Sequence, residues 1–195
     1  NFSSGLVIDQ GKLLELGIQP DFLICRSEKK LEKELRDKIA LFCNVEPKAV
    51  ISNYDCSSIY EVPLVLYKEK FDSIVLSKLG LQDKKIKLEE WEAICEKIKN
   101  PLKTVEIAVC GKYVDHLDAY KSIIEAFVHA GAENNCKVKI RWLQAENCET
   151  EDIAKFLKGV DGILVPGGFG ERGIEGKITA AKYARENNIP FFGIC

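Results

Sequence analysis

The fold of this chain is decided by the stretch Val165-Pro166-Gly167-Gly168-Phe169-Gly170-Glu171-Arg172-Gly173, which joins an apolar strand to a helix. The strand is predicted over Gly162–Val165 and the helix over Ile174–Asn187. A second apolar strand, Pro190–Ile194, follows the helix and leads directly into Cys195. A strand, a glycine-rich turn, a helix and a second strand in this order predict a parallel βαβ unit.

The same alternation extends back along the chain as far as Asn100-Pro101. Proline disfavours helical backbone at the residue before it, so this dipeptide ends a charged helix that we expect over Glu89–Lys99. Between this break and the glycine-rich stretch, strands and helices are expected in turn at Val105–Cys110, Leu117–Ala130, Lys137–Leu143 and Thr150–Lys158. This half is therefore predicted to be a parallel sheet with helices on both faces.

The residues before the break carry a second set of elements. We expect a strand over Asp21–Arg26, an amphipathic helix over Leu31–Cys43, a strand over Ala49–Ser52, and helical stretches near residues 58–67 and 69–79. The fold class is therefore α/β, with parallel sheets flanked by helices. We place the two domains at residues 1–100 and 104–195.

Composition excludes several classes of protein. The chain is 46% hydrophobic and 30% charged, which is typical of a soluble globular protein. Its net charge of −2 gives no basic surface for nucleic acid, and no apolar run approaches the ~18 residues of a membrane span. Its 8 cysteines include no C-x-x-C pair, so we expect buried, reduced thiols in a cytoplasmic protein and no metal site.

Cys195 and Gly168 are the first candidates for a functional site. Parallel strands end at one edge of a sheet, so the thiol at the end of one strand and the N–H groups of the glycine turn after its neighbour should meet there. A nucleophilic cysteine also needs a base, normally a histidine. His116 and His129 are the two histidines present, and neither is well placed, so we expect the base elsewhere. Taken singly, Cys195 would more often be a core thiol and Gly168 part of an ordinary turn, and it is their combination on neighbouring strands that favours a site.

Two features of the first half are less specific. Lys38 lies within a predicted helix, where a solvated lysine is the ordinary case. Tyr54-Asp55-Cys56 follows a predicted strand and precedes a helical stretch, so these residues could face a ligand or belong to a capping turn.

The ordered set of motifs resembles the CTP synthase family from about Gly17 to Cys195. The motifs that carry the resemblance are Gly17-Ile18-Gln19-Pro20-Asp21, Ile24-Cys25-Arg26-Ser27, Lys38–Val45, Ser58–Pro63, Gly111-Lys112-Tyr113, Asp118–Ser122, Val165–Gly176 and Tyr183–Pro190. The resemblance implies a Rossmann-like synthase (amidoligase) part up to residue 100, followed by the first half of a class I glutaminase domain.

The resemblance also implies an activity. Members of the family use ATP and Mg²⁺ to phosphorylate UTP, and ammonia released from glutamine then displaces the phosphate to give CTP. GTP is the expected activator, CTP the product inhibitor, and a homotetramer the expected assembly. The Mg²⁺ ligands are expected outside these residues.

Site residues follow from the resemblance, position by position. Cys195 matches the glutaminase nucleophile and Gly168 the glutamine-binding glycine. Lys38 matches a lysine of the UTP/CTP site, and the loop Tyr54, Asp55 and Cys56 matches one that contacts the ATP adenine, although the family more often has Lys-Asp-Val there. Phe169 and Arg172 match a lid loop linked to GTP activation.

The N-terminal segment departs from the family pattern. Asn1–Gln10 lacks the Lys-x-Lys-Pro-Thr-Gln stretch that grips the pyrimidine nucleotide in the family, and the chain contains no methionine. We therefore expect these residues to be part of a longer protein and to be inactive alone. Two alternatives stay open at this point: another class I glutamine amidotransferase, and a truncated, non-catalytic homologue that acts as a binding or filament subunit.

Overall fold

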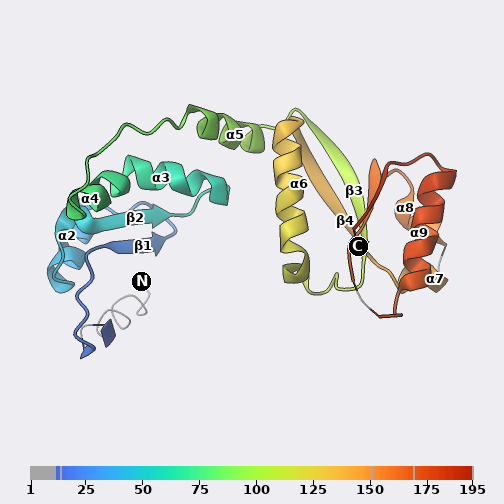
Figure 1. Cartoon of the computed structure of the whole chain (residues 1–195), viewed down its shortest axis with the longest axis horizontal. Helices are drawn as coiled ribbons and strands as arrows, with labels where there is room; N and C mark the ends of the chain where they lie inside the picture. The colour runs from blue at the N-terminus through green and yellow to red at the C-terminus, as the bar shows by residue number, and fades with distance from the viewer. Residues whose placement is uncertain (1–11, 14, 151, 169, 195) are drawn as a thin grey trace. The chain divides into compact units, whose positions relative to one another are not determined.

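The computed structural model describes residues 12–13, 15–150, 152–168 and 170–194 of the chain (Figure 1). The chain divides into two compact units, residues 1–95 and 96–195. This division falls inside helix α5 (Glu89–Lys99), whereas the boundary expected from the sequence follows that helix. We refer to the two parts as unit 1 and unit 2.

Unit 1 is built on two parallel strands, β1 (Leu23–Ser27) and β2 (Val50–Tyr54). Helix α2 (Lys33–Phe42) connects them and packs on one face of the pair, where a small core forms from Cys25, Ile39, Ala40, Cys43 and Val50. The fully buried hydroxyl of Ser52 accepts a hydrogen bond of 2.9 Å from the N–H of Leu31. That bond fixes the segment by which the chain enters α2.

The other elements that the structure describes in unit 1 are helical. Its elements are η1 (Pro47–Ala49), η2 (Ile59–Glu61), α3 (Val62–Lys68), α4 (Phe71–Lys78) and the first part of α5. The Ser58 hydroxyl caps η2 by accepting from the N–H of Tyr60. Helix α5 is held at the same place, because Trp91 Nε1 donates to the carbonyl of Tyr60 at 2.8 Å.

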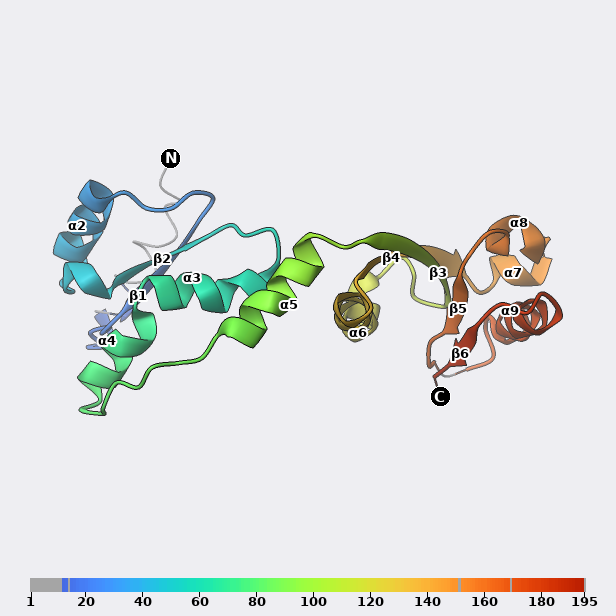
Figure 2. The same ribbon diagram turned by 90° about the horizontal axis from the view of Figure 1, so that it is seen from above.

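Unit 2 is a four-stranded parallel sheet in the order β4-β3-β5-β6. Its strands are β3 (Lys103–Gly111), β4 (Cys136–Gln144), β5 (Gly162–Val165) and β6 (Phe191–Gly193). The helical elements are η3 (Leu117–Tyr120), α6 (Lys121–Glu133), α7 (Asn147–Thr150), α8 (Ile153–Leu157) and α9 (Ile174–Glu186). Figures 1 and 2 show α6 on one face of this sheet and α8 and α9 on the other.

The main core of unit 2 lies between the sheet and the side that carries α8 and α9. Small side chains fill it, because Ala108 and Cys110 of β3 and Ala180 and Ala184 of α9 are almost completely buried. Small residues let the helix approach the sheet closely. The expected arrangement of a parallel sheet covered on both faces is confirmed.

One expected helix is divided in two. The sequence pattern predicts a helix over Thr150–Lys158, but α7 ends at Thr150 and α8 begins at Ile153. The cause is Asp152, whose carboxylate accepts a hydrogen bond of 3.1 Å from the N–H of Ala154 and caps α8. A capping aspartate starts a new helix, so the segment cannot be one continuous helix through this residue.

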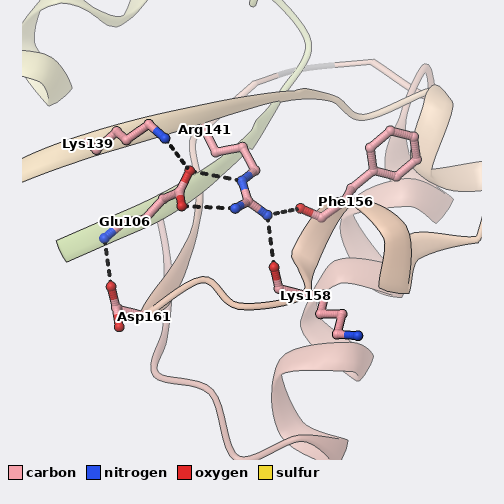
Figure 3. Close-up of polar contacts among 6 residues, drawn as sticks. All are labelled: Glu106, Lys139, Arg141, Phe156, Lys158 and Asp161. Carbon is pink, nitrogen blue, oxygen red and sulfur yellow. Dashed lines mark hydrogen bonds and ion pairs between the residues drawn. The ribbon is translucent and has the colours of Figure 1, made fainter.

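A cluster of charged residues fastens the α8–β5 connection to the sheet (Figure 3). Arg141 of β4 donates two hydrogen bonds to the Glu106 carboxylate, of 3.1 and 2.9 Å, and Nη1 of the same guanidinium donates to the carbonyls of Phe156 and Lys158. The Asp161 carboxylate accepts the N–H of Glu106 at 2.7 Å. The positive and negative charges within the cluster compensate one another. Glu106 lies before the carboxyl end of β3, and ligands of parallel sheets bind at the carboxyl ends. We therefore assign the cluster a role in stabilising the fold.

None of the described helices has the length and apolarity that a membrane crossing requires.

Candidate active site

The carboxyl ends of β3, β5 and β6 meet at one edge of the sheet in unit 2. The strand register pairs Val109 with Leu164 and Val165 with Gly193, and the N–H of Ile194 donates to the carbonyl of Val165 at 2.9 Å. The residue before Cys195 therefore lies beside the start of the glycine-rich loop. Cys195 itself lies outside the described residues.

The end of β3 is shaped by a close contact between Gly111 and Tyr120. A Cβ on Gly111 would lie 2.5 Å from the Tyr120 hydroxyl oxygen and 3.1 Å from Cγ of Pro166, so no larger residue fits there without displacement. The buried Tyr120 ring also stacks on Trp142 of β4 at 5.7 Å between centroids. Glycine at this position allows β3 to approach both the tyrosine and the first residue of the loop.

Two lysines contact the glycine-rich loop from different elements. Lys112, which is 5% exposed and follows β3, donates from Nζ to the carbonyl of Gly170 at 2.6 Å. Lys177 of α9 donates from Nζ to the carbonyl of Pro166 at 3.1 Å. A Cβ on Gly168 would lie 3.5 Å from Lys177 Nζ and 3.7 Å from Lys112 Cδ, so both side chains also reach the predicted glutamine-binding glycine.

Arg172 is linked to β4 by a short polar chain. Its Nε lies 2.6 Å from Oε1 of Glu146, and Gln144 Nε2 donates to Oε2 of Glu146 at 2.7 Å and to the carbonyl of Lys112 at 3.1 Å. The Arg172 side chain is 64% exposed, so it lies at the surface of the loop. Phe169, its predicted companion in the lid, lies outside the described residues.

Burial changes the acidity of two groups at this edge. The pKa of Lys177 lies below its usual value because burial disfavours the ammonium form and because Lys112 adds a second positive charge nearby. The pKa of the Cys110 thiol is raised by its hydrogen bond with Cys148 and by burial. Cys110 is therefore a protonated core thiol and not a nucleophile.

The predicted nucleotide-binding residues of unit 1 come from two separate elements. Lys38 is exposed on α2, and the loop Tyr54–Cys56 begins at the end of β2. Asp55 forms an ion pair with Arg26, and its N–H donates to the carbonyl of Ser27 at 3.0 Å. Among the described residues of unit 1, no hydrogen bond or ion pair joins Lys38 to this loop.

The residues of Tyr54–Cys56 face different surroundings. Cys56 Sγ lies 3.4 Å from the carbonyl of Tyr54, and burial raises the pKa of its thiol. Asp55 stays exposed, with its ion-pair partner Arg26 on the neighbouring strand. Within the described part of the chain, no three His, Cys, Asp or Glu side chains gather as a metal-binding group.

Sequence reasoning did not single out Lys177, Gln144 or Glu146. One signal was available for Lys177, because a lysine in the first turn of a helix lies against the positive end of the helix dipole. No comparable signal exists for Gln144 and Glu146, since they are ordinary polar residues at and after the end of a strand.

Comparisons with known proteins cover both units. Residues 8–81 match the family described as CTP synthase N-terminus, and residues 115–195 match the family described as glutamine amidotransferase class-I. The CTP synthase of Cytophaga hutchinsonii is 58% identical over 184 residues, which are 94% of this chain and 34% of that protein. The CTP synthase of Chloroherpeton thalassium is 56% identical over 187 residues, with the same coverage of 94% and 34%.

A solved structure is also similar in sequence. The glutaminase domain of Trypanosoma brucei CTPS, determined with bound acivicin, is 43% identical, with 46% of this chain and 35% of that chain covered and a TM-score of 0.43.

The parallel sheet, the glycine-rich loop at its carboxyl edge and the match over residues 115–195 define unit 2 as part of a class-I glutamine amidotransferase domain. The curated relatives align across unit 1 as well, in the same order along the chain. The chain belongs to the CTP synthase family. It spans about a third of the length of the curated relatives that it matches.

Proposed function

We propose that this chain serves in the conversion of UTP to CTP, in which ATP activates the pyrimidine and glutamine supplies the nitrogen. The observation that carries this proposal is the similarity to CTP synthases over 94% of the chain, which joins a synthase part to an amidotransferase part in one polypeptide. Another class I glutamine amidotransferase would account for residues 115–195 and leave residues 8–81 without explanation.

The two parts have separate tasks in this proposal. Residues 1–100 form the C-terminal part of the amidoligase domain, and residues 104–195 form the N-terminal half of the glutaminase domain. ATP and Mg²⁺ act in the amidoligase reaction, and we assign no step to the metal because the described residues contain no group suited to hold it. GTP is the proposed activator and CTP the proposed product inhibitor, in a cytoplasmic homotetramer.

Cys195 is the proposed nucleophile of the glutaminase step. Its thiolate forms a bond to the side-chain carbonyl carbon of glutamine, and the carbonyl oxygen becomes an oxyanion. When the oxyanion collapses, the C–N bond breaks and the leaving nitrogen takes up a proton, equivalent to the one that the Cys195 thiol lost, so that it departs as ammonia. A glutamyl thioester remains, which water hydrolyses to glutamate and the free thiol. The backbone N–H groups around Gly168 are suited to stabilise the oxyanion, because the loop follows β5 at the edge where β6 leads to Cys195.

The remaining assignments concern nucleotides. Lys38 is proposed to contact the triphosphate nucleotide UTP or CTP, for which its exposed ammonium is suited. Tyr54, Asp55 and Cys56 are proposed to contact the ATP adenine through their backbone, since Tyr54 and Cys56 differ from the lysine and valine of the usual Lys-Asp-Val. Phe169 and Arg172 are proposed to form the lid that responds to GTP, and the Arg172–Glu146 ion pair would hold one of its positions.

The test is an assay of the intact gene product that contains this chain. We expect CTP to form from UTP, ATP and Mg²⁺ with glutamine as nitrogen donor, and GTP to increase the rate. Formation of glutamate from glutamine without CTP would favour another amidotransferase. Absence of both products, with nucleotide binding retained, would favour the non-catalytic homologue.

A further inference from the structure

Two ammonium groups hold the two ends of the glycine-rich turn in unit 2. Lys177 Nζ donates to the carbonyl of Pro166, at the start of the turn, and Lys112 Nζ donates to the carbonyl of Gly170, at its end. Gly168 lies between these two anchor points in the chain. A Cβ atom added to Gly168 would lie 3.5 Å from Lys177 Nζ and 3.7 Å from Lys112 Cδ, so both lysine side chains lie close to this glycine. The turn is therefore fixed from β3 on one side and from α9 on the other.

This arrangement has an electrostatic cost. Lys112 is 5% exposed, and the pKa of Lys177 is lowered by burial and by the charge of Lys112, so the ammonium form of Lys177 is disfavoured. Lys177 also stands in the first turn of α9, where the helix dipole opposes a positive charge. An apolar side chain of similar length would avoid these costs but would leave the Pro166 and Gly170 carbonyls without these donors. The two lysines therefore hold the turn at an electrostatic cost.

The charges become favourable when a negative charge develops beside the turn. A tetrahedral intermediate places an oxyanion against the N–H groups of the turn, and preorganised positive groups behind those amides stabilise it without reorganisation. An oxyanion hole also depends on the amides being held within a fraction of an ångström of the productive position. Lys112 and Lys177 supply both the charge and the fixed carbonyl positions.

We propose that Lys112 and Lys177 are positioning residues of the glutaminase step. They hold the Pro166 and Gly170 carbonyls so that the amides around Gly168 face the developing oxyanion, and their charges strengthen that interaction. This inference rests on the proposed glutaminase function of unit 2. It concerns the transition state, so these lysines affect the rate of glutamine cleavage more than the binding of glutamine.

The principal test is Lys177→Met in the intact gene product, which removes the ammonium and keeps the length of the side chain. We expect kcat of glutamine-dependent CTP formation to fall by about tenfold or more, with KM for glutamine changed less than about twofold. CTP formation from ammonium salts should keep its rate, because that reaction bypasses the turn. The matched control is Lys182→Met on the same helix, whose side chain is 63% exposed, and it should leave both rates unchanged.

A second variant tests whether the two lysines act on one feature. Lys112→Met should also lower kcat with glutamine, and the double variant should lose less than the product of the two single effects, because both act through the same turn. If Lys177→Met fails to fold, Lys177→Gln removes the same ammonium with a side chain that water can solvate and carries the same expectation.

Several results would overturn the inference. An unchanged kcat with glutamine would do so, and so would an equal loss with ammonia, because neither fits a role confined to the turn. If the wild-type protein forms no CTP from either nitrogen source, the proposed function fails and the anchoring is judged by hydrogen exchange of the residue 167–170 amides. Faster exchange in Lys177→Met than in the wild type and in Lys182→Met supports the anchoring. Equal exchange in all three contradicts it.

Discussion

The hydroxyl of Tyr120 accepts a hydrogen bond of 3.0 Å from the N–H of Lys112. The same oxygen accepts the N–H of Tyr113 at 3.1 Å, so one side chain pairs two successive backbone donors after β3. Because Tyr120 is 4% exposed, water cannot readily replace it. This contact links η3 to the segment from which Lys112 reaches the glycine-rich loop.

We predict that Tyr120→Phe destabilises the protein by about 1–3 kcal/mol, since the change keeps the ring and removes the acceptor of two backbone N–H groups, one of them in a buried hydrogen bond. Urea denaturation measures the free energy of unfolding. Tyr183→Phe, on α9 and partly buried against the core, is a matched control for loss of a tyrosine hydroxyl. An equal effect of the two changes would show that the Tyr120 hydroxyl has no special role.

Gly111→Ala tests the close approach from the other side. Its Cβ would lie 2.5 Å from the Tyr120 hydroxyl oxygen and 2.9 Å from Cζ, so we expect destabilisation of about 1–3 kcal/mol. In the Tyr120→Phe background the nearest atom is absent, and the cost of Gly111→Ala should be smaller. Strict additivity in a double-mutant cycle of unfolding free energies would contradict the contact.

The Glu106–Arg141 pair predicts a pH dependence of stability. The hydrogen bonds from Arg141 are the largest cause of the lowered pKa of Glu106, so the carboxylate stabilises the fold above the pKa of about 4.5 that it has when unfolded. This stabilisation is lost as pH falls through the folded-state pKa. The difference in unfolding free energy between wild type and Glu106→Gln should therefore be largest near neutral pH and shrink below pH ~4.5.

The control for this experiment is Glu186→Gln, because the Lys182–Glu186 pair is exposed and its atoms are 3.9 Å apart. We expect no comparable pH dependence there, since exposed pairs contribute little. A difference for Glu106→Gln that stays constant from neutral to acidic pH would refute the assignment.

The buried thiols predict an order of chemical modification. Cys110 and Cys148 are buried with their sulfur atoms 3.9 Å apart, and the pKa of Cys110 is raised, so neither should react with an alkylating reagent in the folded protein. Cys136 is only half-buried and should react first among these three. Mass spectrometry of peptides after timed labelling measures the order, and early labelling of Cys110 would contradict the packing.

Much of the fold was predictable because local signals agree with tertiary packing. The strand Gly162–Val165 and the helix Glu89–Lys99 have the bounds that the sequence predicts, since Gly162 and Asn100-Pro101 mark where each segment starts or stops. The strands β3 and β4 are longer than the apolar segments from which they were predicted. The backbone hydrogen bonds between the two strands continue through the polar residues at their ends. The division of the predicted helix at Asp152 could have been read from its capping side chain.

The site was predictable in part. Gly168 and the strand that leads to Cys195 follow from the order of strands, because parallel strands end at a common edge. The two lysine contacts depend on how α9 and the segment after β3 fold over the loop, so no local sequence pattern predicts which carbonyl each ammonium contacts. The roles assigned to all of the site residues stay predictions, and Cys195 and Phe169 also lie outside the described part of the chain.

The most direct measurement of the central claim is the choice of nitrogen source by a Cys195→Ala variant of the intact gene product. We predict that CTP formation with glutamine is abolished, while formation with ammonia, UTP and ATP continues at the wild-type rate. That outcome would place the nucleophile in unit 2 and the nucleotide chemistry in the synthase part. Loss of both activities in a folded variant, or retention of the glutamine-dependent reaction, would contradict the account.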